Sequence, residues 1–77
     1  TQETDVEMFE IHIDDDAQSI NKKISKLDLG QDVLISSIIR DGKIVLPKGN
    51  VCIKAQDILF ILTSTEKIDE INAILNN

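Results

Sequence analysis

The chain has 77 residues, 42% of them hydrophobic and 29% charged, which predicts one folded domain with a single core, too small to hold a catalytic cleft between domains. Its net charge of −6 and its two aromatic residues argue against nucleic acid and anionic lipid surfaces as partners, because like charges repel and rings for base stacking are scarce. No apolar run approaches the ~20 residues that span a bilayer. The N-terminus has no targeting pattern, and the single cysteine, Cys52, cannot form an internal disulfide, so we expect a cytoplasmic protein without membrane insertion.

The beginning of the chain divides into a polar start and a strand. The first residue is Thr1 instead of Met, which suggests a fragment of a longer protein or a processed chain. We expect residues 1–5 to be a disordered or added start, and residues 6–77 to be a single domain. From Val6 to Ile13 apolar and polar side chains alternate, with Phe9 and Ile11 on the apolar side. A period of two predicts a strand with one buried face.

An amphipathic helix is predicted next, after an acidic triplet. Four apolar residues are spaced by three, four and three positions, as on one face of an α-helix: Ala17, Ile20, Ile24 and Leu27. We interpret Asp14, Asp15 and Asp16 as the cap of this helix, since carboxylates accept the free N–H groups of a first turn. Calcium is not favoured, because the mid-loop Gly and late Glu of a twelve-residue calcium loop are missing.

Two strands joined by a tight turn follow. The run from Val33 to Ile39 is rich in β-branched residues and predicts a strand. Asp41-Gly42 is a preferred two-residue hairpin turn, which leads into a strand from Lys43 to Leu46. The ladder is expected to end at Pro47, which lacks an N–H group, and Gly49.

The last third of the chain predicts a short strand, a central strand and a helix. The short strand is expected at residues 51–53. From Asp57 to Thr63 five apolar residues follow one another, which is typical of a strand covered on both faces. Thr63 or Ser64 is expected to cap the final helix, with Glu66 placed for a capping box, and the apolar stripe of that helix is Ile68, Ile71, Ile74 and Leu75. The predicted fold is α+β, a sheet of about four to five strands in the order β-α-β-β-β-β-α, packed with two helices.

Part of the chain resembles a known family. Residues 34–50, LISSIIRDGKIVLPKGN, and residues 55–62, AQDILFIL, together with the order of elements, resemble the TrkA-C domain. This domain, also called RCK-C, is the C-terminal regulatory domain of potassium channels and transporters. The positions that carry the resemblance lie in the hairpin and in the strand start about ten residues later: Ile38, Arg40, Gly42, Pro47, Gly49, Asp57 and Leu59. The resemblance extends roughly from Val6 to Leu75.

Two positions depart from the pattern of the family. The family usually has Gly where Asn21 stands before Lys22, and Gly before the strand aspartate where Gln56 stands. Asn adopts the left-handed conformation readily and Gln less so. The turn at Gln56 is therefore expected to differ from that of the family or to carry strain.

The resemblance implies a cytoplasmic regulatory module that pairs about a two-fold axis and binds small effectors at the pairing groove. Some members bind cyclic di-AMP with the help of a basic residue in the segment between the first helix and the second strand. Here that segment, Asp28–Asp32, is short, acidic and without Arg. The sequence therefore does not favour cyclic di-AMP.

The sequence offers no catalytic constellation, no metal site and no cofactor motif. His12 alternates with buried positions and is interpreted as a surface residue, while Cys52 has no catalytic partner nearby in the sequence and is interpreted as core filler. One Cys and one His do not suffice for a structural zinc site, and no Gly-rich phosphate loop is present. Lys22 and Lys26, one turn apart on the predicted helix, form either an anion-facing edge or a solvated face.

We expect the pairing or ligand groove to involve strand two and the hairpin that follows it, at Ser36, Ser37, Ile38, Arg40 and Pro47. The preferred hypothesis is a dimeric regulatory domain of a potassium or other cation transport protein, which acts by conformational change. The partners would be a second copy, the parent transporter or channel, and a small effector. The alternative is a ligand-free dimerisation module of a cation/proton antiporter or another transporter. A small hydrolase or metal enzyme would need a constellation that the sequence lacks.

Overall fold

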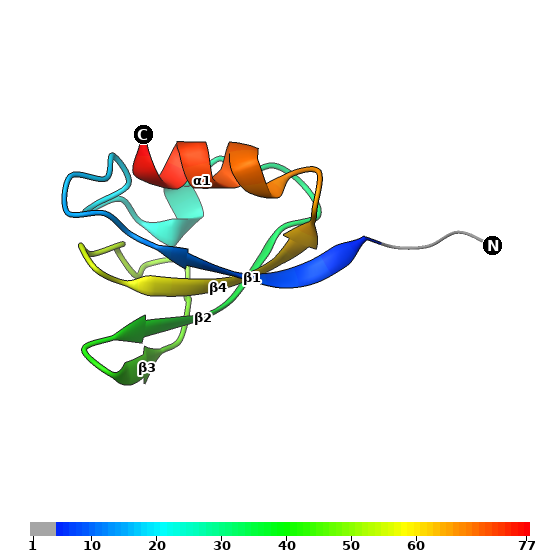
Figure 1. Ribbon diagram of the computed structural model, residues 1–77. Helices are drawn as coiled ribbons and strands as arrows, with labels where there is room; N and C mark the ends of the chain where they lie inside the picture. Colours follow the sequence, from blue (N-terminus) through cyan, green and yellow to red (C-terminus); the bar gives the residue numbers. More distant parts are fainter. Residues whose placement is uncertain (1–4) are drawn as a thin grey trace.

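The computed structural model describes residues 5–77 and shows an α+β fold, as the sequence predicts (Figure 1). A four-stranded antiparallel sheet is covered on one face by a single α-helix and by the loop that contains a short 3-10 helix. In chain order the elements are β1 (Val6–His12), the 3-10 helix η1 (Ile24–Lys26), β2 (Leu34–Arg40), β3 (Lys43–Val45), β4 (Ile58–Ser64) and α1 (Ile68–Asn76).

The sheet has the strand order β1-β4-β2-β3, with all neighbours antiparallel. The strand predicted to be central, β4, lies between β1 and β2, because its unbroken apolar run suits a position with a neighbour on each side. Val6 pairs with Ser64 at one end of the β1-β4 ladder and His12 with Ile58 at the other. The hairpin of β2 and β3 turns at Asp41-Gly42, both with positive φ, as the sequence predicts.

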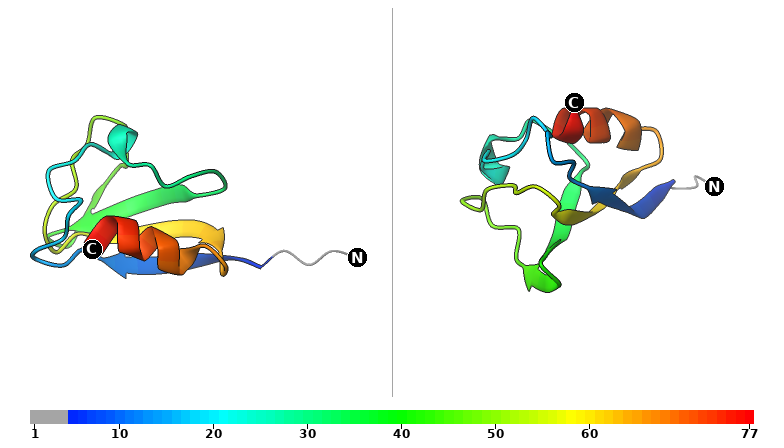
Figure 2. Two further views of the ribbon diagram at one scale, coloured as in Figure 1. Left: turned by 90° about the horizontal axis from the view of Figure 1, so that it is seen from above. Right: turned by 60° about the vertical axis from the view of Figure 1, so that its left-hand side comes forward.

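The core lies between the sheet and α1. Alternate residues of the strands are buried together with two helix residues, Ile71 and Leu75. Figure 2 shows α1 lying across one face of the sheet. The buried apolar side chains are Ile11, Ile13, Ala17, Ile35, Ile38, Ile53, Leu59, Ile61, Ile71 and Leu75. Cys52, which the sequence suggested as core filler, is only partly buried and is not among the buried core residues.

The first predicted helix is wrong, because residues 14–27 form turns, isolated bridges and η1 instead of an α-helix. Their backbone groups bond across to residues 49–53: Asn21 N–H donates to the carbonyl of Ile53 at 2.8 Å, and Ile24 N–H to that of Val51 at 2.9 Å. Asn21 itself has φ +69°, which ends any right-handed helix there. The apolar residues of the pattern still reach the core, since Ala17 is buried and Leu27 packs against it.

Two smaller predictions are also corrected. The strand predicted at residues 51–53 is reduced to isolated bridges, Ile53 with Ile20 and Cys52 with Lys23, so the sheet has four strands. The acidic triplet at 14–16 caps no helix and belongs to a turn, in which Asp15 accepts a hydrogen bond from the Gln56 amide at 3.1 Å.

The predicted cap of the final helix is wrong as well. The helix begins after Lys67, which makes no side-chain cap bond, and Thr63 lies inside β4. The hydroxyl of Thr63 donates instead to the carbonyl of Asp32 at 2.9 Å, because β4 continues to Ser64 and carries the hydroxyl away from the helix start.

Left-handed backbone occurs at both positions where the family usually has Gly. Gln56 has φ +66° and Asn21 has φ +69°. The turn at Gln56 thus adopts the left-handed conformation with a side chain that disfavours it, which stores local strain. Most of the start predicted for residues 1–5 lies outside the described residues; Asp5 is described, and its carbonyl accepts a hydrogen bond from the N–H of Thr65 at 3.0 Å.

Candidate functional site: a groove beside Pro47

A groove of about 500 Å³ lies between the 24–33 loop and the beginning of β2. We call it the Pro47 groove. Most of its lining is apolar: Ile24, Leu27, Leu29, Val33, Leu34, Ile35 and Pro47. The other residues that line it are Asp28, Gly30 and Gln31. A concave apolar surface with a few polar groups is the usual form of a small-molecule site.

One wall of the groove is the first half of β2, which has a neighbouring strand on one side only. Within residues 5–77, β3 pairs with Ile38–Arg40 of β2, whereas residues 34–37 pair with β4 alone. A bulge at Ser36 marks the boundary, since the register shifts between Ile35 and Ser37. The first half of β2 therefore presents a free backbone edge next to the groove, of the kind that pairs with another strand.

The loop that forms the opposite wall is held in place from β4 and from the helix start. The Thr63 hydroxyl donates to the carbonyl of Asp32, and the Lys67 ammonium donates to the carbonyl of Gln31 at 2.6 Å. Asp32 has φ +63° and Gly30 φ +84°, so the loop turns twice through left-handed backbone. These contacts position Leu29 and Gln31 at the groove.

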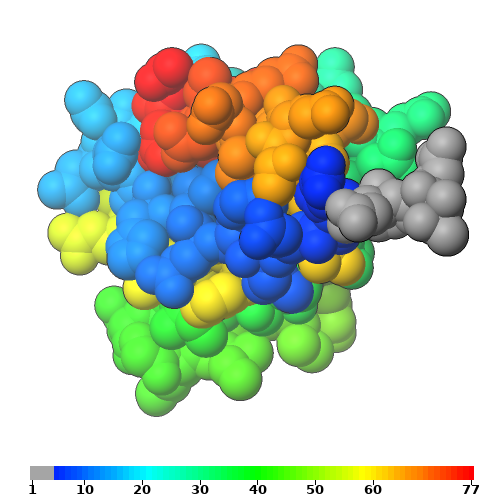
Figure 3. Space-filling view, turned by 45° about the vertical axis from the view of Figure 1, so that its right-hand side comes forward, coloured from blue at the N-terminus to red at the C-terminus, as the bar shows by residue number. Residues whose placement is uncertain are grey.

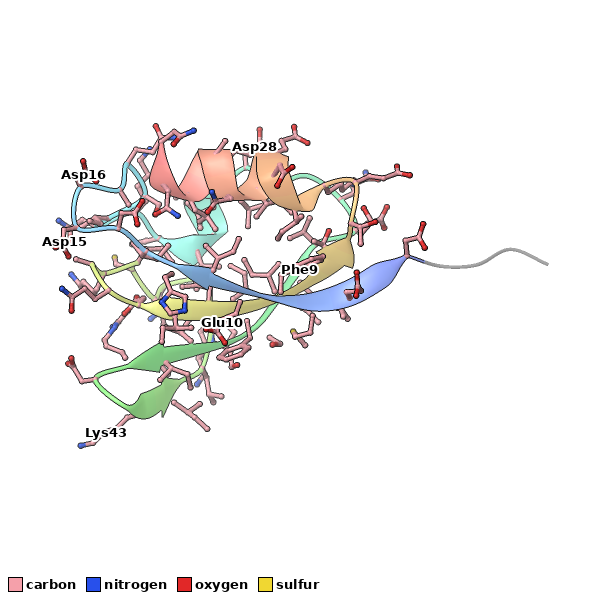
Figure 4. The ribbon with its side chains drawn as sticks, in the orientation of Figure 1. Phe9, Glu10, Asp15, Asp16, Asp28 and Lys43 are labelled. Carbon is pink, nitrogen blue, oxygen red and sulfur yellow. The ribbon has the colours of Figure 1, made fainter. Side chains whose placement is uncertain are left out.

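The charge of the groove is acidic. Asp28 is the one charged residue among those that line it, and it is exposed. It lies on the side of the molecule where α1 lies (Figure 4). Gln31 adds an amide that both donates and accepts. With its apolar floor, the groove can bind a compact ring or apolar group that also carries hydrogen-bond donors.

The structure does not bring the five predicted groove residues together. Pro47 lines the groove. Ser36 lies at the bulge with its hydroxyl 3.0 Å from the carbonyl of Phe60 and 3.6 Å from the sulfur of Met8, and Ser37 is half-buried beside it. Ile38 is fully buried in the core and has no free surface to offer a ligand in this conformation.

The fifth of these residues, Arg40, is engaged in an ion pair. Its guanidinium donates to both carboxylate oxygens of Asp57 at 2.8 Å each, and to the carbonyl of Cys52 at 2.9 Å. Asp57 is fully buried and also accepts from the N–H of Lys54 at 2.9 Å. The hydrogen bond from Arg40 to Asp57 raises the pKa of the arginine above its ordinary value, while burial acts in the opposite direction. The pair joins the β2-β3 hairpin to the start of β4.

Lys22 and Lys26 are both exposed, but the geometry assumed for them is absent. Lys22 lies in the loop before η1 and Lys26 at the end of η1, so they are not one α-helical turn apart. Their role as an anion-facing edge stays a prediction without its original geometric basis.

Of the ten residues that line the groove, only Pro47 is among the predicted groove residues; Ile24, Leu27 and the residues of the 28–35 segment that line it were missed. The helical spacing assigned Ile24 and Leu27 to a helix face, and the α-helix does not form. The loop from Asp28 to Asp32, which the family resemblance singled out, is a signal that could have found Asp28, Leu29, Gly30 and Gln31.

Other candidate chemistry can be reported briefly. Within the described residues, no three His, Cys, Asp or Glu side chains gather where they could hold a metal ion. His12 is exposed and lies 2.6 Å from the carboxylate of Glu10. In the same part of the chain no helix has the length and apolar character needed to span a membrane.

Comparison with known families agrees with the fold. A family model described as the TrkA-C domain matches residues 8–76. A Trk system potassium uptake protein TrkA homolog of Archaeoglobus fulgidus is 35% identical over 69 residues, which is 90% of this chain and 16% of that protein. The Trk system potassium uptake protein trkA homolog 1 of Methanosarcina mazei is 24% identical over 72 residues, which is 94% of this chain and 18% of that protein. The chain thus spans less than a fifth of the length of these curated relatives.

Two solved structures have the same fold. One is described as the structure of an RCK domain with cda; it has a TM-score of 0.78 and 23% identity, and the match covers 90% of this chain and 97% of that one. The other is described as an RCK_C domain dimer of S. agalactiae BusR in complex with c-di-AMP; it has a TM-score of 0.71 and 18% identity, and the match covers 91% of this chain and 94% of that one.

Proposed function

This chain belongs to the TrkA-C domain family, and we propose that it is a cytoplasmic regulatory domain of a potassium or other cation transport protein, which binds a small effector in the Pro47 groove. The observation that carries the proposal is the groove itself, a hollow of about 500 Å³ lined mostly by apolar residues, one wall of which is a loop fixed from two sides. Its volume lies within the range of small-molecule sites.

The groove also suggests where a second copy binds. The free edge of β2 at residues 34–37 lies along the groove, and Leu34 beside it is 58% exposed. A second copy that approaches this edge about a two-fold axis would bring two grooves together. One effector held between them would then bias the arrangement of the two subunits, and the parent transporter would respond to that arrangement.

The lining limits the chemistry of the effector. Asp28 repels phosphate groups, and the described residues that line the groove include no Lys or Arg to offset that repulsion. The related BusR domain dimer is in complex with c-di-AMP. For this chain the groove favours a less anionic effector, with ring or apolar groups against Leu29 and Pro47 and donors toward Asp28.

A thermal-shift and calorimetry screen tests the proposal. The 77-residue chain is titrated with c-di-AMP, mononucleotides, nucleosides, and mono- and divalent cations, since a ligand that binds only the folded state raises the melting temperature in a dose-dependent way. Leu29→Ala should weaken the response about tenfold or more, and Leu46→Ala is the matched control, because Leu46 is exposed next to Pro47 and does not line the groove. Equal responses of the two variants would refute the groove as the site.

The acidic lining also favours a second candidate, a dimerisation module of an antiporter or another transporter that binds no effector. This candidate predicts a dimer by light scattering that no compound in the screen stabilises. A monomer with no ligand response would contradict both candidates.

A further inference from the structure

The face of the sheet turned away from α1 is apolar and uncovered within residues 5–77. Side chains alternate along each strand, so the residues between the core positions lie on this face. We call it the open sheet face and define it by Val6, Met8, Ile39, Ile44, Ile58, Phe60 and Leu62. Figure 3 shows the atoms of β4, in yellow, between those of β1, in blue, and those of the β2-β3 hairpin, in green.

The pairing registers place these side chains in two adjoining rows. The first row crosses all four strands, with Ile58, Ile39 and Ile44 beside His12. In the second row, Met8 lies beside Leu62. Phe60 lies on β4 between the two rows. The apolar patch is therefore continuous across the middle of the sheet.

This composition is unusual for a face in contact with water. An antiparallel sheet with one solvated face normally alternates apolar inward and polar outward residues. Here Ile44 is 70% exposed, Met8 51% and Val6 44%. The charged side chains on the face are Glu10 and His12, which lie at the β1 edge and pair with each other. Glu10 points away from α1 and Phe9 toward it (Figure 4).

We propose that a second copy of this chain covers the open sheet face, with the two sheets packed face to face. Three seven-residue strands and the three-residue β3, at ~3.3 Å per residue and ~4.8 Å spacing, give a planar area of about 380 Å². Two such faces in contact remove on the order of 1,000 Å² of accessible surface, which is near the lower limit for a specific interface. The area thus suits a weak, concentration-dependent self-association.

The two outer strands of the sheet differ on the open sheet face. There β1 carries the mutually paired Glu10 and His12, whereas β3 presents Ile44; Glu7 and Lys43 pair with Thr63 and Arg40 and lie on the opposite face. A two-fold axis parallel to the strands places β1 of one copy over β3 of the other. The Glu10–His12 pair of each copy then lies at the rim of the contact, and the apolar side chains of β4 and β2 meet at its centre.

This surface is separate from the Pro47 groove and does not depend on the function proposed for it. Leu34 borders both surfaces, and the other residues of the open sheet face do not line the groove. If both surfaces pair, the chain forms assemblies of four or more; if only the open sheet face pairs, it forms dimers.

Light scattering after size exclusion and sedimentation at several concentrations test the proposal on the 77-residue chain. We expect Ile44→Lys and Met8→Lys, at two exposed positions on different strands, each to raise the dissociation constant at least tenfold and to halve the mass of the largest species. Asn72→Lys is the matched control, because this exposed residue lies on α1, across the sheet. Circular dichroism verifies that each variant keeps its fold.

A groove variant separates this association from the function proposed for the groove. Leu29→Ala, which alters only the groove, should leave this association unchanged. The proposal is overturned if the Leu29→Ala variant shows no self-association, because all association would then depend on the groove. It is also overturned if Ile44→Lys and Met8→Lys have the same mass distribution as the wild type.

Discussion

Replacing Arg40 by Ala leaves the Asp57 carboxylate buried without its cation. The side chain of Asp57 is 0% exposed and that of Arg40 27%, so the pair is shielded mainly on the aspartate side. The substitution removes two hydrogen bonds to Asp57 and one to the carbonyl of Cys52, and leaves Asp57 with the Lys54 N–H. Breaking a buried pair by removing one partner typically costs ~3–5 kcal/mol, and we take about 3 because Arg40 is partly exposed.

In a domain of this size a loss of about 3 kcal/mol lowers the melting temperature by roughly 12–24 °C. Urea unfolding followed by circular dichroism measures the loss directly, with an unchanged slope expected if only stability is affected. Arg40→Lys keeps the charge but cannot form the bidentate contact with Asp57, so it should lower the unfolding free energy by less than Arg40→Ala does. The double variant Arg40→Met/Asp57→Asn should recover part of the stability, because the amide oxygen still accepts from Lys54.

The raised pKa of Arg40 fixes the pH dependence of this effect. A basic group whose pKa is raised by folding stabilises the protein fully below its unfolded pKa, and the contribution is lost only as the pH rises through the folded value. The difference in unfolding free energy between wild type and Arg40→Ala should therefore stay constant from about pH 7 to about pH 10. The assignment of the pair as a buried anchor would be refuted if Arg40→Ala lowered the unfolding free energy by less than about 1 kcal/mol. It would also be refuted if the difference between wild type and variant shrank between about pH 7 and about pH 10.

Three further predictions follow from single residues. Gln56→Gly should raise the unfolding free energy by about 0.5–1 kcal/mol in urea titrations, since Gly adopts φ +66° without strain, whereas Ala55→Gly, outside the left-handed region, should lower it. Ile38→Ala should cost ~2–5 kcal/mol, as expected for a fully buried core residue; a near-neutral result would contradict its place in the core. Thr63→Val should cost about 1–2 kcal/mol and speed hydrogen exchange in the 28–32 loop, because its bond to Asp32 is lost; unchanged exchange there would contradict that anchor.

The sequence predicts most of the sheet correctly and fails where the backbone pairs at long range. β1, the hairpin and the central place of β4 follow from alternation, the Asp-Gly turn and an unbroken apolar run. The first helix does not form, because a spacing of three and four residues shows which side chains are buried and not where their backbone groups bond. Those of Asn21 and Ile24 bond to residues near Cys52, some thirty positions away, and no local pattern contains that pairing.

The candidate site was predicted only in part, for a similar reason. Pro47 lies in the groove, but its neighbours come from the loop after η1, and a loop has no period from which its facing side chains can be inferred. Arg40 belongs to the motif that carries the resemblance, and the motif alone does not show that its guanidinium faces Asp57. A search for a buried partner for each charged motif residue would have paired the two.

The position of β1 at the edge next to β4 has a consequence for how the chain folds. Val6 pairs with Ser64 and with no residue nearer in sequence, whereas the β2-β3 hairpin closes over a two-residue turn. Topologies dominated by distant pairings fold more slowly than those built from local ones. During synthesis the hairpin can form early, while β1, which emerges before it, waits with Met8 and Ile11 unpaired until β4 has emerged.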